Sequence, residues 1–223
     1  MVAPTTTDTD TELSAVNTIL GAIGQSPVTT LGTVSTVNNI STYQNPEISF
    51  VYNLLKESSL DVQNEGWMFN KEEEVKKSPD VNKEILIPAN ILRMDIHDSA
   101  DRDMDVIIKD HNGTKKLYDK LKVNSTSSSP WEFDNDIYVD IVYWYEYDDI
   151  PSTFKRYITY KAAGRAATQL VGNPQLTQLL AQYELQARAA VMEYECTQGD
   201  HNYLGMPRDY GLQTYQPYKA LRR

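Results

Sequence analysis

The spacing of apolar residues changes twice along this chain, from a helical period to a strand period and back to a helical one. In residues 11–24, in residues 45–66 and again in residues 151–196, apolar side chains recur three and four positions apart, as on one face of an amphipathic helix. In residues 136–147 (DIYVDIVYWYEY) they alternate with a period of two, as in a strand. Helices at both ends with strands between them predict an α+β fold.

The first helical stretch begins near residue 11 and ends at a glycine. Asp10 or Thr9 is placed to cap its free N–H groups, because a side-chain oxygen at that position accepts a backbone hydrogen bond. Gly24 ends the stretch, and Pro27 follows shortly after it. The residues from there to Gln44 are rich in Thr, Ser, Asn and Val, which predicts a loop with one short extended piece.

Asn45-Pro46 predicts the start of a second helix. The Asn side chain caps the helix, and proline costs nothing in the first turn, where its missing N–H has no partner to lose. Gly66 is the predicted end. Trp67 and Phe69 follow directly, and we expect these bulky rings to fill the core.

The middle of the chain contains one strong turn signal and one clear strand. His111-Asn112-Gly113-Thr114 predicts a β-hairpin, because both central residues tolerate positive φ. In the strand at 136–147, one face carries Ile137, Val139, Ile141, Tyr143 and Tyr145. Its other face is only partly polar, so we expect that face to be covered as well. Residues 124–130 (NSTSSSP) predict a flexible connector.

Two further helices are predicted after Pro151. The first carries Phe154 and Tyr157 on its apolar stripe and ends at Gly172. Asn173-Pro174 then starts the second helix with the same device as Asn45-Pro46. Its predicted stripe consists of Leu176, Leu179, Leu180, Tyr183, Ala187, Ala190, Val191 and Tyr194. The short connection predicts that the two helices are antiparallel.

These elements predict an α+β fold with a four-helix bundle, built from two N-terminal and two C-terminal helices, a central antiparallel β insertion and an extended C-terminal arm. The expected domains are a bundle of residues 1–74 and 149–199, a β-rich insertion of residues 75–148, and an arm of residues 200–223.

The expected arm has no helical or strand period, but it is rich in tyrosine and ends in basic residues. Its candidate interface residues are Tyr203, Tyr210, Tyr215, Tyr218, Arg222 and Arg223. A segment that cannot fold alone yet carries four tyrosines is either a loose end or an arm that buries those rings on another subunit. We favour the arm.

The charge of the chain is acidic and unevenly distributed. The net charge is −10 over 223 residues, with 12 basic and 26 acidic side chains in residues 1–150 and 9 basic and 5 acidic side chains in residues 151–223. An acidic chain is a poor general ligand for nucleic acid, and surfaces of opposite sign suit a protein with different partners at its two ends. A solvated acidic face with a chance excess of arginine is the alternative.

Composition also bounds the location of the protein. The single cysteine, Cys196, excludes a disulfide framework within the chain. No apolar run reaches the length of a membrane span, and residues 1–10 lack the pattern of a signal peptide, so we expect a soluble protein without a membrane partner.

No metal or cofactor site is predicted. Asp101, Asp103 and Asp105 imitate the start of a calcium loop, but Val106 replaces the required glycine and Asn112 the final glutamate. The three histidines, His97, His111 and His201, have no partner at the spacing of a zinc motif. The sequence also lacks a phosphate-binding loop and a dinucleotide fingerprint.

No catalytic residues are predicted either, and we expect a protein that is not an enzyme. Cys196 and His201 stand five residues apart without a third group to orient them, and Cys196 follows an apolar stripe. Abundant carboxylates would allow the acid and base of a glycosidase, but their separation in space decides that chemistry.

Four segments of the chain resemble the tail tubular protein A family of short-tailed, podovirus-type bacteriophages. They are ELSAVNTILGAIGQSPV at 12–28, ISFVYNLLKESSLDVQNEGWMFN at 48–70, ILIPANILRMD at 85–95 and YEYDDIPSTFKRYITYKAAGRAATQLVGN at 145–173. The resemblance spans residues 11–200, and the phrase ending in Glu65-Gly66-Trp67 and Phe69 is its most specific part.

The resemblance implies a structural virion protein. Members are adaptor rings, commonly of twelve copies, between the portal and the tail nozzle, so the implied partners are the chain itself, the portal protein and a nozzle protein of the tail tubular protein B type. Genomic DNA would pass through the ring without sequence-specific binding, and the protein would be found in the virion tail after assembly in the host cytoplasm. Two alternatives remain open: a tail-associated enzyme that degrades peptidoglycan, and a carbohydrate-binding β module that uses Trp131 or Trp144.

Overall fold

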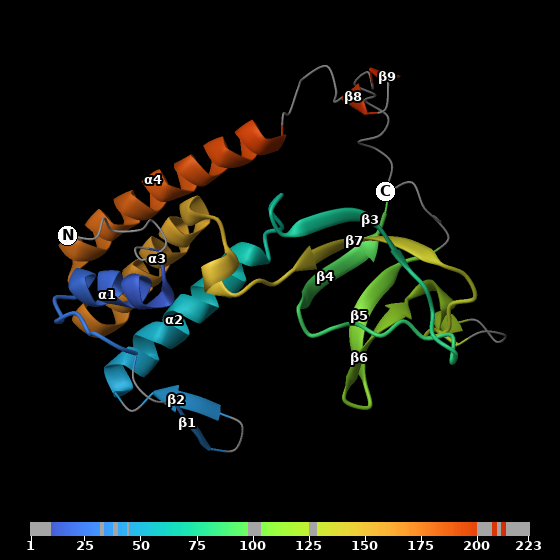
Figure 1. The fold of residues 1–223 in the computed structure, drawn as a ribbon, viewed down its shortest axis with the longest axis horizontal. Coiled ribbons are helices and arrows are strands. Elements are labelled where there is room, and N and C mark those ends of the chain that lie inside the picture. The colour runs from blue at the N-terminus through green and yellow to red at the C-terminus, as the bar shows by residue number, and fades with distance from the viewer. Residues whose placement is uncertain are drawn as a thin grey trace, which may run out of the picture. The chain divides into compact units, whose positions relative to one another are not determined.

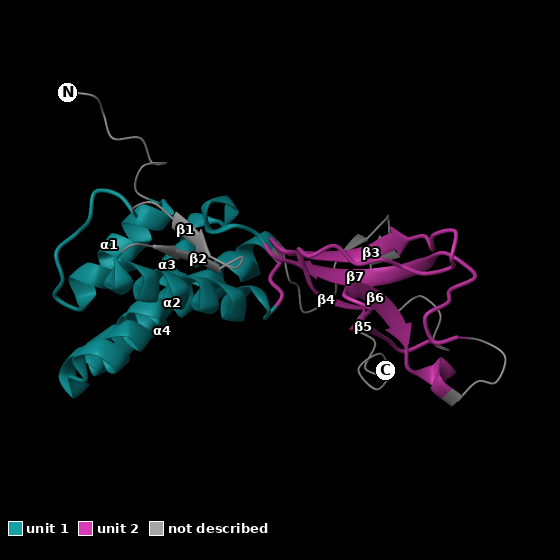
Figure 2. Cartoon of the chain, turned by 90° about the horizontal axis from the view of Figure 1, so that it is seen from below, with its two compact units in different colours: residues 1–65, 145–198 teal, residues 66–144, 199–223 magenta. Residues whose placement is uncertain are grey.

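The computed structural model describes residues 10–31, 34–37, 40–43, 45–97, 104–124, 129–199, 207–208 and 211–212. In this part of the chain the fold is α+β, with four α-helices and several small antiparallel sheets (Figure 1). The chain divides into two compact units: a helical unit of residues 1–65 and 145–198, and a β unit of residues 66–144 and 199–223 (Figure 2). The β unit is therefore inserted into the sequence of the helical unit, between its second and third helices.

The helical unit begins with two helices whose starts are set by capping side chains. They are α1 (Glu12–Ala22) and α2 (Pro46–Gln63). Asn45 Oδ1 accepts a hydrogen bond from Glu47 N at 2.9 Å, which confirms the predicted start of α2. The cap of α1 is Thr11, whose Oγ1 accepts from Ser14 N at 3.3 Å, so the prediction of Asp10 or Thr9 was wrong by one or two residues.

Between these helices lies a small ladder formed by β1 (Val34–Val37) and β2 (Ile40–Tyr43). The two strands are antiparallel, with Val34 opposite Tyr43 and Val37 opposite Ile40. The sequence predicted one extended piece here, and the structure has a pair.

The second half of the helical unit is an antiparallel helix pair. It consists of α3 (Ser152–Ala166), a π-helical turn η4 (Ala167–Val171) and α4 (Pro174–Gly199). Gly172, at φ +65°, ends the π-helical turn, and Asn173 Oδ1 accepts from Gln175 N at 3.0 Å at the start of α4. The predicted break and restart at these residues is confirmed.

α3 is the central helix of this unit. It packs against α1 and α2, and its buried side chains are spread over most of its circumference. α4 packs on it from another side through ring contacts described below. The fully buried apolar side chains of the unit are Val16, Ile19, Leu20, Val51, Leu55, Val62, Phe154, Tyr157, Ile158, Ala162, Ala163, Ala166, Ala167 and Val191.

The β unit contains a three-stranded sheet and a hairpin. The sheet has the order β3-β7-β4, and all its pairs are antiparallel. Its strands and those of the hairpin are β3 (Lys71–Lys77), β4 (Ile91–Ile96), β5 (Val106–His111), β6 (Thr114–Asp119) and β7 (Ile137–Tyr143).

The hairpin of β5 and β6 turns at the predicted residues. Asn112 and Gly113 have φ of +55° and +76°, as a two-residue type I′ turn requires, and Asp110 Oδ1 accepts from Gly113 N at 2.9 Å. The other edge of β6 pairs with a segment that follows β3. There, Ile87 N donates to Lys115 O and Leu117 N donates to Ile85 O, both at 3.0 Å.

β7 is the middle strand, and its predicted alternation is largely confirmed. Ile137, Val139 and Ile141 are buried in the core of the unit, whereas Tyr145 lies beyond the end of the strand. Val142 on the opposite face is also buried, but Tyr138 on that face is 41% exposed, so this face is covered only in part. The core consists of Ile85, Ile87, Ile91, Met94, Val106, Leu117, Phe133, Ile137, Val139 and Ile141.

The remaining elements are short. Single turns of 3₁₀ helix lie at η2 (Leu121–Asn124) and η3 (Tyr147–Asp149), and a two-residue ladder joins β8 (Pro207–Arg208) to β9 (Gly211–Leu212). That ladder was not predicted from the sequence. In the part of the chain that the structure describes, no helix has both the length and the hydropathy to cross a membrane.

Candidate assembly surface

One buried glutamine holds together the two places where the sequence leaves and re-enters the helical unit. Gln63 is fully buried near the end of α2, and its amide makes both possible backbone bonds to Tyr145. Gln63 Nε2 donates to Tyr145 O at 3.0 Å, and Tyr145 N donates to Gln63 Oε1 at 2.8 Å. A primary amide offers the same donor and acceptor as a peptide group, so Gln63 acts as a one-residue strand partner.

An asparagine joins the two ends of the β unit in the same way. Asn70 Nδ2 donates to Tyr143 O at 2.9 Å, Tyr143 N donates to Asn70 O at 2.8 Å, and Asn70 Oδ1 accepts from Trp67 N at 2.8 Å. The Asn70 side chain is almost completely buried, as is Trp67. The predicted core role of Trp67 is therefore confirmed, whereas Phe69 is only half-buried.

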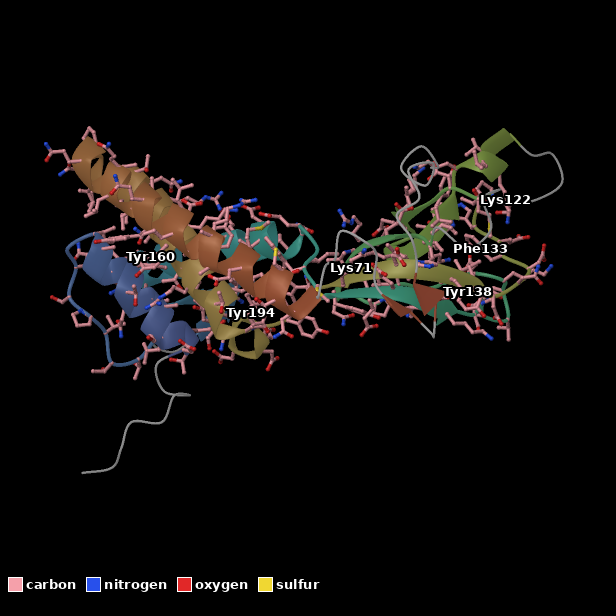
Figure 3. The ribbon with its side chains drawn as sticks, turned by 90° about the horizontal axis from the view of Figure 1, so that it is seen from above. Lys71, Lys122, Phe133, Tyr138, Tyr160 and Tyr194 are labelled. Carbon is pink, nitrogen blue, oxygen red and sulfur yellow. The ribbon has the colours of Figure 1, made fainter. Side chains whose placement is uncertain are left out.

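α4 is held on α3 by aromatic rings and one arginine. Phe154 meets Tyr194 with ring centroids 5.9 Å apart, and Tyr160 meets Tyr183 at 5.6 Å (Figure 3). Arg188 Nη1 donates to the Tyr157 hydroxyl at 3.1 Å. Residues early in α3 thus contact residues late in α4, which confirms the predicted antiparallel arrangement.

The outward surface of α4 carries exposed apolar side chains among polar ones. The predicted stripe is wrong in part: Leu180, Ala187 and Val191 are buried, but Leu179, Tyr183 and Ala190 are exposed. Leu185 and Met192, which no stripe predicted, are 67% and 48% exposed. The reason is that one neighbouring helix, α3, can cover only one side of α4. Exposed apolar side chains gathered on one helix are a candidate for contact with another molecule.

Charged side chains of the helical unit form surface ion pairs. Arg165 on α3 reaches Asp61 at 3.2 Å and Glu57 at 3.7 Å, and Arg188 on α4 reaches Glu65 at 3.2 Å. Exposed pairs of this kind contribute little to stability, about 0–1 kcal/mol each. Their consequence is that Arg165 and Arg188 are matched to acidic residues in α2 or just after it.

Charged side chains of the β unit are paired in the same manner. The pairs are Lys71 with Glu73, Lys76 with Asp136, Lys83 with Asp134, Lys116 with Glu84 and Lys120 with Asp105. Hydrogen bonds from the lysines lower the pKa of the Asp134 and Asp136 carboxyls. A general acid needs a raised pKa, so these two carboxyls do not suit that role.

The histidines that the sequence singled out have partners other than metals. His97 Nδ1 lies 2.7 Å from Asp140 Oδ1, and the His111 ring lies 4.5 Å from the ring of Trp131. His201 lies outside the described residues. Within those residues, no group of three His, Cys, Asp or Glu side chains is placed to hold a metal ion.

The calcium-like sequence is described only at its end, because Asp101 and Asp103 lie outside the described residues. Asp105 binds Lys120, and its N–H donates to Asp119 Oδ1 at 3.3 Å. Asp119 is fully buried and also accepts from Leu121 N at 3.0 Å, so it fixes the start of η2. Its Oδ2 has no hydrogen bond, and Lys122 Nζ lies 4.0 Å away.

The remaining candidates for chemistry are one cysteine and two tryptophans. Cys196 is exposed on α4. Trp131 contacts Tyr118 as well as His111 and is half-buried, and Trp144 is also half-buried, so neither ring stands free as a flat sugar-binding platform. The six C-terminal candidates, Tyr203, Tyr210, Tyr215, Tyr218, Arg222 and Arg223, lie outside the described residues, as does the central part of the expected 124–130 connector.

One buried hydroxyl makes the helical unit sensitive to alkali. Burial raises the pKa of Tyr147 to about 12, although a hydrogen bond to Thr159 Oγ1 at 2.9 Å opposes the shift. The folded pKa lies above the unfolded value of about 10, so the stabilisation is complete below pH 10 and is lost as the pH rises through 12. Two pKa units correspond to about 2–3 kcal/mol.

We therefore expect the helical unit to lose about 2–3 kcal/mol of unfolding free energy between pH 9 and pH 12 through Tyr147 alone. Urea denaturation followed by circular dichroism at 222 nm measures this loss. Tyr147→Phe should flatten the pH dependence, whereas Tyr138→Phe, at an exposed position of β7, should leave it unchanged. Equal slopes for the wild type and Tyr147→Phe would contradict the assignment.

A family model described as tail tubular protein matches residues 13–201 of the chain. The match covers nearly all of α1, the whole of α2, α3 and α4, and every strand of the β unit except β8 and β9. It also covers the hydrogen-bonded pairs Gln63–Tyr145 and Asn70–Tyr143, which we call the two amide clamps. The six C-terminal candidates lie beyond it. No curated protein matches the chain.

Proposed function

The chain belongs to the tail tubular protein family and is a structural component of a phage tail, and from this premise we propose that it is the adaptor ring that joins the portal to the tail nozzle. The observation that carries the proposal is the apolar outward surface of α4, which suits a protein made to be covered by neighbours. In the described residues, many of the charged groups are engaged in ion pairs.

The finer features of the proposal concern the assembled state. About twelve copies form a closed ring, the portal protein contacts one end and a nozzle protein of the tail tubular protein B type contacts the other. A closed ring needs two different patches on each copy. The four helices act in it as one bundle, with the β unit as a separate module, and assembly takes place in the host cytoplasm before the ring becomes part of the virion tail.

DNA passes through this ring without sequence-specific binding. Residues 1–150 carry 26 acidic and 12 basic side chains, and a channel with the sign of the phosphate backbone lets a duplex slide without sticking.

The C-terminal segment is proposed as a docking arm. Tyr203, Tyr210, Tyr215 and Tyr218 would bury their rings on the portal or on a neighbouring copy, and Arg222 and Arg223 would add charge at its end. This proposal rests on the composition of the segment.

Head-to-tail joining in a phage that lacks the endogenous protein tests the function. Without the chain, we expect DNA-filled heads that carry no tails, and the full chain should restore joining. A chain truncated after Gly199 should form the helical and β units but fail to join heads to tails. Electron micrographs that show tails joined in the absence of the protein would overturn the adaptor, and full joining by the truncated chain would overturn only the arm.

The two alternative functions are separated by their own assays. Turnover of purified peptidoglycan that is abolished by one Asp or Glu substitution in a still-assembled protein would favour the enzyme. Binding to a glycan array that depends on Trp131 or Trp144 would favour the carbohydrate module. The pairing of carboxylates with lysines and the half-buried state of both tryptophans favour neither.

A further inference from the structure

α4 is apolar on two opposite sides. Leu180, Ala187 and Val191 face α3. The opposite side carries a second set, which we call the outer stripe and which consists of Ala181, Leu185, Ala189, Met192 and Cys196. At about 100° per residue, these five positions fall within about 80° of one another and lie roughly opposite the buried set. All five are exposed, Leu185 at 67% and Met192 at 48%.

The spacing of the outer stripe suits another helix. Ala181 and Met192 are eleven residues apart, as are Leu185 and Cys196, and eleven residues make about three turns. The stripe therefore runs nearly straight along α4 over roughly 23 Å. Small and large side chains alternate along it, which gives the ridges and grooves that helices use to pack.

The charges near the stripe favour a second copy of the chain over DNA. α4 has 26 residues and four charged side chains, of which Glu184, Glu193 and Glu195 are acidic. The only basic one, Arg188, already pairs with Glu65. An acidic rim repels phosphate. On α3, Arg156 is exposed and Lys161 is half-buried, and the helix carries no acidic residue, so a second copy offers the opposite charge.

The size of the stripe distinguishes a ring contact from a stable dimer. The outer stripe is about 23 Å long, and a strip about 10 Å wide along it covers about 230 Å². A standard stable interface buries about 800 Å² on each partner. A pair of copies held through this stripe alone would therefore be weak. In a closed ring every copy makes such a contact on two sides, so each copy is held by two of them.

We propose that the outer stripe of α4 is a surface through which each copy of the chain docks on the next copy. The inference rests on the proposed ring, and it names the surface through which neighbouring copies of that ring meet. The occupant is a helical surface of the second copy, and the contact consists of apolar packing inside an acidic rim.

Cys196 reports directly on this contact, because it lies on the stripe and is the only cysteine of the chain. We expect it to react with N-ethylmaleimide at least about tenfold more slowly in the assembled ring than in dilute, unassembled protein, since packing excludes the reagent. The control is Leu86→Cys in a Cys196→Ser background, which places a thiol on an exposed position of the β unit and should react equally in both states.

A charge placed on the stripe should prevent assembly. Leu185→Glu with Met192→Glu should keep the wild-type circular dichroism, because both side chains are exposed, but light scattering should give the mass of single copies where the wild type forms rings. The matched control is Leu86→Glu, at a similarly exposed position, which should assemble normally.

The outcomes separate the two proposals. A ring that forms while Cys196 keeps its dilute reaction rate, or that forms from the double variant, overturns the stripe and leaves the adaptor intact. A wild-type chain that forms no ring, either alone or with portal protein, overturns both.

Discussion

Replacement of Phe154 by alanine is expected to lower the unfolding free energy of the helical unit by about 3–5 kcal/mol, because it removes a large ring and leaves a cavity that the neighbours cannot fill. Phe154 has no exposed surface, lies on the central helix α3, and contacts the ring of Tyr194. The surroundings come from several helices, so no single movement closes the space.

The loss is measured by urea denaturation followed at 222 nm, a signal to which the helices contribute most. Leu185→Ala on α4 is the matched control, since this side chain is 67% exposed and its truncation should cost less than about 1 kcal/mol. A loss of less than about 1 kcal/mol for Phe154→Ala would show that α3 is not the centre of the packing.

Gly66→Ala is expected to destabilise the β unit by about 2–4 kcal/mol, for two separable reasons. Gly66 has φ of +79°, a conformation that costs an alanine about 1–2 kcal/mol. An added Cβ would also meet Val142 Cγ2 at 3.2 Å and Arg93 Nη2 at 3.0 Å. The arginine can move away, but Val142 is packed in β7, and overpacking costs about 1–3 kcal/mol.

Gly113→Ala isolates the first of these reasons. Gly113 lies in the same unit, has φ of +76°, and has no atom within 4 Å of an added Cβ, so only the backbone cost applies. The three tryptophans of the chain all belong to the β unit, and their fluorescence reports its unfolding. Equal losses for the two variants would mean that the contact with Val142 contributes nothing.

Local turn and cap chemistry made several elements predictable from the sequence. Asn45-Pro46 starts α2 and Asn112-Gly113 turns the hairpin, because the side chain or backbone of the residue itself decides the conformation. These features do not depend on what the rest of the chain does.

β3 was not predictable in this way. Its sequence, KEEEVKK, has Val75 as its single apolar residue and shows no alternation. The strand forms because β7 supplies a partner, and a bulge between Glu72 and Val75 adapts the register. Glu74 there has φ of +58°, and its N–H donates to Asp140 Oδ1 at 3.1 Å. The conformation of such a strand is set by the strand that pairs with it and not by its own sequence.

The surface residues were predictable only in part. The sequence predicted that α4 carries apolar residues, but it did not predict which of them would be exposed to solvent. That exposure depends on how many other helices pack against α4. Gln63, Asn70 and Asp119 were missed altogether, since polar residues are normally expected outside and only their backbone partners explain their burial. The position of Asn70 three residues after Trp67 carried no signal of its own.

The two amide clamps have a consequence for the order in which the chain folds. The helical unit is discontinuous in sequence, so α1 and α2 cannot meet α3 until a long loop closes, and closure of a long loop costs more entropy than closure of a short one. The segment from 66 to 144 is continuous and can acquire its structure first. Once Asn70 has bound Tyr143, Gln63 and Tyr145 are separated by only a few free residues, and the remaining search is nearly local. Pairing of the strands therefore shortens the loop that must close before α1 and α2 can pack against α3.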